Sequence, residues 1–159
     1  MVNELGTDLV LMIGVTSSLI SLIVGLIALN STRDNAKVIK AKFKFQLFEK
    51  RHEVFMATWR FMADLLQKDP ITTTDILNFS NNTANAKFLF DAGIVDFLEE
   101  VRMKGIRLGT AEYTLARPSS DEVRQQMSTE RHNIVSWVET EMRVVKERFK
   151  PYLDVSEWK

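Results

Sequence analysis

Residues Leu9 to Leu29 form an apolar run of 21 positions without a single charged residue. Leu, Ile and Val dominate it, and a helix of this length rises roughly 31 Å, which is close to the hydrocarbon thickness of a bilayer. A cleaved signal peptide would have a basic start, whereas this chain begins with Glu4 and Asp8. The pattern therefore predicts an uncleaved transmembrane helix.

One side of this predicted helix carries only small side chains. They follow one another at intervals of 4, 3, 4, 3 and 4 residues: Gly14, Ser18, Ser21, Gly25, Ala28 and Thr32. Small residues let helices approach closely in lipid, and a mean spacing of 3.5 residues is the period of a left-handed coiled coil. We therefore expect the span to self-associate into a homo-oligomer. The alternative is that Gly and Ser, which are ordinary in membrane helices, fall into register by chance.

Flanking charges give the span a direction. No Lys or Arg precedes it, whereas residues 33–51 carry seven basic and two acidic side chains. The positive-inside tendency places the N-terminus outside and the rest of the chain in the cytoplasm. The expected organisation is a tail and anchor over residues 1–32 and a helical cytoplasmic domain over residues 33–159. The same cations would lie near the anionic inner leaflet, although setting the topology is a sufficient role for them.

Beyond the span, apolar residues recur at helical intervals. No Pro or Gly interrupts residues 36–66, and Asp69-Pro70 ends this segment. Its intervals of 3 and 4 residues predict an amphipathic helix with one apolar stripe. The stripe includes Val38, Phe45, Phe55, Trp59, Met62 and Leu66.

Further helices are expected in the rest of the chain. A short one begins near Thr73 or Thr74, either of which can cap it, and the Asn-rich residues 81–85 predict a turn or a weak helix end. A longer one covers roughly residues 94–116 and buries Ile94, Phe97, Leu98, Val101, Gly105 and Leu108. Ser119 or Ser120 caps the last helix, and Pro151 ends it. Because no strand pattern holds, the fold class is all-α: a transmembrane helix followed by a small cytoplasmic bundle.

Composition narrows the possible functions. The chain has 21 basic and 21 acidic residues and no cysteine, which excludes disulfides, thiolate catalysis and Cys-based metal sites. The basic block lies beside the predicted membrane and is not spread over a nucleic-acid footprint. His52 and His132 are the only histidines, and no Glu-x-x-His pair repeats, so no metal or cofactor is expected. No recognisable catalytic constellation or phosphate loop occurs, and we expect no enzyme.

Four cations form the one candidate ligand site. If the first and last long helices are neighbours, an anionic small molecule could bind between them. The candidate residues are Lys50, Arg51, Arg131 and His132. The favoured alternative is that these side chains pair with Glu49, Glu53 and Glu130 on the surface, because exposed ion pairs are common and weak.

Three motifs carry a resemblance. They are Leu47-Phe48-Glu49-Lys50-Arg51 with Val54-Phe55, then Ala86-Lys87-Phe88-Leu89-Phe90, and finally Phe149-Lys150-Pro151-Tyr152-Leu153. The chain thereby resembles a loose group of uncharacterised bacterial membrane-anchored proteins with a short N-terminal anchor and a helical cytoplasmic domain. The resemblance implies a bacterial inner-membrane location and transfers no catalytic residue.

Two functions fit these expectations. The first is a non-enzymatic single-pass membrane protein that self-associates through its anchor and presents its cytoplasmic domain to a protein partner. The second is a membrane-anchored sensor-effector of the phage-defence type, whose bundle binds an anionic small molecule such as a nucleotide signal. Convergence of the four cations on one cleft would favour the second function.

Overall fold

The structure is a computed structural model that describes residue 35 and residues 37–154. Its contacts divide the chain into two compact units, Met1–Lys44 and Phe45–Lys159. The predicted span, its small-residue stripe from Gly14 through Ser18, Ser21 and Gly25 to Ala28, and the boundary after residue 32 all lie outside the described residues. In the first unit, residues 37–44 are helical. Among the described helices, none combines the length and the apolar character needed to cross a bilayer.

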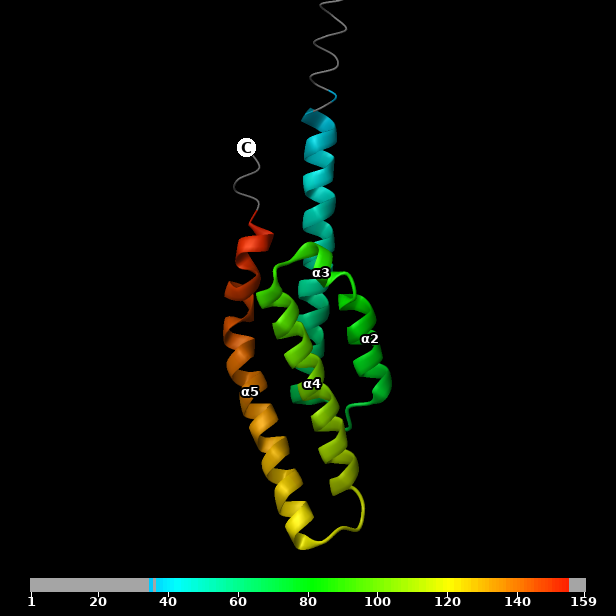
Figure 1. Cartoon of the computed structure of the whole chain (residues 1–159). Coiled ribbons are helices and arrows are strands. Elements are labelled where there is room, and N and C mark those ends of the chain that lie inside the picture. Colours follow the sequence, from blue (N-terminus) through cyan, green and yellow to red (C-terminus); the bar gives the residue numbers. More distant parts are fainter. Residues whose placement is uncertain (1–34, 36, 155–159) are drawn as a thin grey trace, which may run out of the picture. The chain divides into compact units, whose positions relative to one another are not determined.

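The described part of the second unit is built from helices, without any strand, which confirms the all-α class. Its first helix covers residues 45–67. Four further helices follow: α2 (Thr73–Thr83), α3 (Ala86–Leu89), α4 (Ala92–Leu115) and α5 (Asp121–Leu153). Helices α4 and α5 lie side by side, and α2 packs against α4 (Figure 1).

The core lies between these helices, and every one of them contributes to it. Aromatic rings join segments that are far apart in the sequence. Phe61 of the first helix stacks on Phe79 of α2 with centroids 4.5 Å apart, and Phe55 meets Phe149 of α5 at 5.4 Å. The predicted stripe of the first helix is right for Met62, which is fully buried, but wrong for Phe45, which is 53% exposed.

The N-caps of α2 and α5 show how far local sequence decides a helix start. Ser120 accepts a hydrogen bond from the N–H of Val123, as predicted. The α2 cap is Thr72, so the prediction of Thr73 or Thr74 was wrong. Thr72 closes a capping box with Asp75, three residues on, whereas Thr73 and Thr74 have no acidic residue at that spacing.

Of two predicted helix ends, the first is confirmed and the second was wrong. Helix α2 ends at Thr83, inside the Asn-rich run, where the Thr83 hydroxyl donates back to the carbonyl of the buried Phe79. Helix α5 continues past Pro151 to Leu153. There the ring of Tyr152 lies 5.2 Å from that of Phe90, so tertiary packing supports a last turn that lacks one backbone donor.

Candidate functional site

Arg51 is the most firmly held of the four predicted cations. Arg51 donates from Nε to the carbonyl of Leu89 at 3.0 Å and from Nη1 to the carbonyl of Tyr152 at 3.4 Å. Its guanidinium also lies over the Tyr152 ring, 5.5 Å from the centroid. Arg51 therefore ties the first helix to the end of α3 and to the last turn of α5.

The other three cations are less deeply engaged. Lys50 pairs with Glu53 one turn along the same helix at 2.8 Å. His132 is exposed on α5. Arg131 lies 3.6 Å from Asp69 and 3.9 Å from Glu112, so it borders the connector that follows the first helix.

The structure does not bring the two pairs of cations together. The first and last long helices are neighbours, as the ligand-site hypothesis required, but they run antiparallel: Arg51 meets Tyr152, whereas Arg131 meets Asp69. From residue 51 to residue 67 the first helix rises about 24 Å. One small anionic ligand cannot contact both pairs over that distance.

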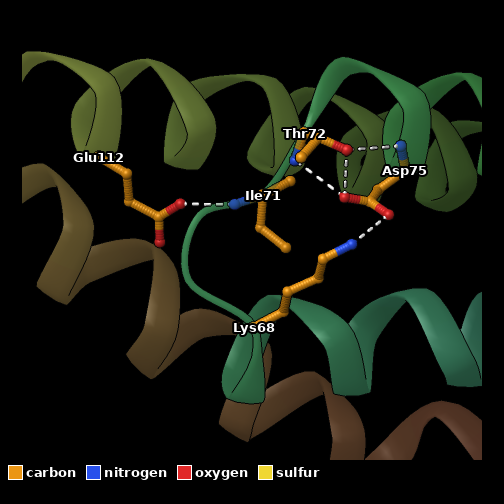
Figure 2. A network of polar contacts seen from close by, with 5 residues as sticks. All are labelled: Lys68, Ile71, Thr72, Asp75 and Glu112. Carbon is orange, nitrogen blue, oxygen red and sulfur yellow. Dashed lines mark hydrogen bonds and ion pairs between the residues drawn. The ribbon is translucent and has the colours of Figure 1, made fainter.

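A buried carboxylate organises the opposite end of the bundle. Residues 68–72 connect the first helix to α2, and the N–H of Ile71 donates to Oε2 of Glu112 at 2.8 Å (Figure 2). The Glu112 side chain is only 5% exposed. Burial raises its pKa, and the charge of Asp69 adds to that rise, while the Ile71 N–H and Arg131 oppose it.

Beside it, a second carboxylate holds the start of α2. Asp75 accepts hydrogen bonds from Nζ of Lys68 at 2.6 Å, from the Thr72 N–H at 2.9 Å and from the Thr72 hydroxyl at 2.5 Å (Figure 2). The hydrogen bond from Lys68 is the largest cause that lowers the pKa of Asp75 to about 2, followed by those from Thr72. Both ends of the connector are therefore held by carboxylates.

A groove of about 760 Å³ opens between this connector, α2 and α4. Gly109 forms part of its wall, and a β carbon at Gly109 would lie only 3.0 Å from the carbonyl oxygen of Ile71, so the glycine permits this close approach. The other walls are largely apolar, with hydroxyl groups at the rim. The lining includes Thr72, Ile76, Leu77, Ile106, Thr110 and Tyr113. Glu112 also lines the groove, and its hydrogen bond with Ile71 ties this part of α4 to the connector.

A second, more polar groove of about 530 Å³ lies between the first helix and α2. Arg60 and Asp64 line one side, and Asn78 and Asn82 line the other. Each pair is four residues apart, so each projects from one face of its helix. These polar groups are distinct from the four predicted cations and were not predicted from the sequence.

Glu112 was not predicted as a functional residue, although the sequence contains a pattern that indicates it. The apolar stripe of α4 passes through Val101, Gly105 and Leu108, and its next position is Glu112. A carboxylate on an apolar stripe indicates a buried polar group that needs a partner. Among the described residues, no group of three His, Asp or Glu side chains is placed to hold a metal ion.

Comparison with known proteins adds no relative. A scan against models of protein families, a search of curated proteins and a search of solved structures each find no match to this chain.

Proposed function

We propose that the chain is a single-pass membrane protein that self-associates through residues 9–29 and presents its helical domain to a protein partner. Its N-terminus lies outside, and the helical domain lies in the cytoplasm of a bacterial cell, at the inner membrane. The observation that carries the proposal is the run of 21 uncharged positions with its stripe of small residues. Small residues favour close helix–helix packing in lipid.

The bundle supports a binding role and not a catalytic one. The groups best placed for chemistry have structural partners: Glu112 holds the connector, Asp75 completes the capping box of α2, and Arg51 ties α3 to α5. The sensor-effector alternative required all four cations to bind one anionic molecule. The separation of Arg51 from Arg131 does not favour that form of it.

The assembly of the full-length protein in mild detergent tests this proposal. Gly14→Leu with Gly25→Leu adds bulk to the small-residue stripe, and we expect it to reduce the oligomer mass. Thr16→Leu is the matched control, because at 3.6 residues per turn position 16 lies about 200° around the predicted helix from position 14. An unchanged oligomer in the double variant, or an equal loss in the control, would show that the stripe is not the interface.

A further inference from the structure

The short segment of residues 37–44 is unusual in what it leaves exposed. It is helical and carries four lysines and no acidic residue. Its large apolar side chains are nevertheless open to solvent: Val38 is 65%, Ile39 68% and Phe43 66% exposed. Exposed apolar side chains beside lysines indicate a surface that binds a partner with both apolar and anionic groups.

The helical spacing groups these side chains. Ile39 and Phe43 are four residues apart and therefore share one face. At 100° per residue, Lys40 and Lys42 lie roughly 80° to either side of the middle of that face. An apolar pair flanked by lysines on both sides is the arrangement of helices that lie in a membrane interface, where the long lysine side chains reach up to the headgroups.

We infer that residues 37–44 lie on an anionic lipid surface, with Ile39 and Phe43 entering the boundary between headgroups and acyl chains. This inference rests on the proposed membrane anchoring, because the anchor would hold the segment beside the bilayer. Each lysine near an anionic surface strengthens binding roughly fivefold. No acidic residue between positions 35 and 48 would oppose that attraction.

A second copy of the chain is the competing occupant. Packing Ile39 and Phe43 of two copies together would cover the apolar pair, but it would also bring the lysines of both copies close together. Lys40 and Lys42, which flank the apolar pair, would then repel their counterparts, since the sequence places no carboxylate among residues 38–44. An anionic lipid surface covers the apolar pair and supplies the opposite charge, so the charge pattern favours lipid.

The chain contains no cysteine, so a single introduced thiol can report on this segment. We would place a polarity-sensitive fluorophore at Phe43→Cys in the full-length protein, reconstituted into nanodiscs of phosphatidylcholine alone or mixed with phosphatidylglycerol. We expect a blue-shifted emission and a severalfold lower quenching by iodide in the mixed discs. Val144→Cys is the control, since Val144 is 44% exposed on α5, outside both grooves, and should remain accessible to iodide in both lipids.

Charge variants test whether the lysines cause the binding to anionic lipid. Replacing the segment lysines 37, 40, 42 and 44 by Gln should abolish the difference in iodide quenching between the two lipids. Removing four lysines from the bundle should leave that difference unchanged. The matched substitutions are Lys87→Gln, Lys104→Gln, Lys146→Gln and Lys150→Gln. Raising the salt concentration should also weaken the effect, because the screening length falls from about 10 Å at 0.1 M to about 3 Å at 1 M.

Two outcomes would overturn the inference. Equal quenching of the Phe43→Cys label in both lipids would exclude an anionic surface, and efficient disulfide formation by Ile39→Cys would identify a second copy as the occupant. Alkaline carbonate extraction separates this failure from that of the proposed function. A chain that stays in the membrane pellet with an accessible label at position 43 refutes only the lipid contact, whereas a chain that is extracted refutes the anchoring as well.

Discussion

Gly105 on α4 lies directly against the ring of Phe61 on the first helix. A β carbon at Gly105 would lie 2.6 Å from Cζ and 3.0 Å from Cε1 of Phe61. Phe61 is itself buried and stacks on Phe79, so its ring cannot move away without disturbing α2. The absence of a side chain at one position of α4 therefore permits three helices to meet.

Gly105→Ala should destabilise the bundle, because the added methyl group overlaps the buried ring of Phe61. Overpacking of this kind costs about 1–3 kcal/mol, and urea unfolding followed by circular dichroism measures it. Gly93→Ala in the same helix is the control. Its β carbon would meet Asp91 at an ordinary 3.4 Å, so we expect no loss, or a gain of up to about 1 kcal/mol. Similar losses in both variants would contradict the proposed clash.

Glu112→Ala should destabilise the end of the bundle at the connector. It leaves the buried N–H of Ile71 without an acceptor, which costs about 1–3 kcal/mol. Glu112→Gln retains a carbonyl oxygen at that place, so its loss should be clearly smaller. Chemical denaturation of both variants gives the comparison. Equal losses would mean that the hydrogen bond to Ile71 contributes little.

The raised pKa of Glu112 also predicts a pH dependence. The folded state keeps the proton at pH values where the unfolded chain has already released it, so stability falls as pH rises from 4.5 through the folded pKa. This decrease should be absent in Glu112→Gln. Unfolding curves of the two proteins across this range test the point, and parallel pH profiles would exclude a raised pKa.

Asp75 should behave in the opposite way. Its pKa is lowered from 3.8 to about 2, so its contribution to stability is complete above 3.8 and is lost as pH falls toward 2. Lys68 donates the hydrogen bond that lowers this pKa most, and Lys68→Met should move it back toward 3.8. Carboxyl carbon chemical shifts of Asp75 measure the pKa directly. An unchanged titration in Lys68→Met would contradict this assignment.

Arg51→Ala should loosen the end of α5. It removes both hydrogen bonds to the carbonyls of Leu89 and Tyr152, and the turn beyond Pro151 then loses a tertiary support. We expect a loss of about 1–2 kcal/mol and faster amide exchange at Tyr152. Lys50→Ala is the control, because its exposed pair with Glu53 on the same helix should contribute less than about 1 kcal/mol. Unchanged exchange in Arg51→Ala would refute the role of this tie.

The proposed topology predicts a labelling pattern. A cysteine at position 3 should react with a membrane-impermeant thiol reagent in intact cells, and a cysteine at position 159 should react only after lysis. The natural chain has no thiol that could confuse the result. The reverse pattern would overturn the orientation that the flanking charges predict.

The amino-acid sequence by itself determined the helical class and most helix boundaries. The cap at Ser120 and the end of the first helix near Pro70 follow from interactions within a few residues, which is why local reasoning finds them. The prediction of the α2 cap was wrong because Thr72 forms a capping box with Asp75. The prediction that Pro151 ends α5 was wrong because Phe90 packs against the last turn.

Only the tertiary structure decided how distant residues pair. Periodicity shows which face of a helix is apolar, but it shows neither which helix covers that face nor in which direction the two run. The antiparallel packing of the first helix and α5 places Arg51 beside Tyr152 and Arg131 beside Asp69. It thereby separates cations that looked like one site, because proximity between distant segments depends on the paths of whole helices and not on any local signal.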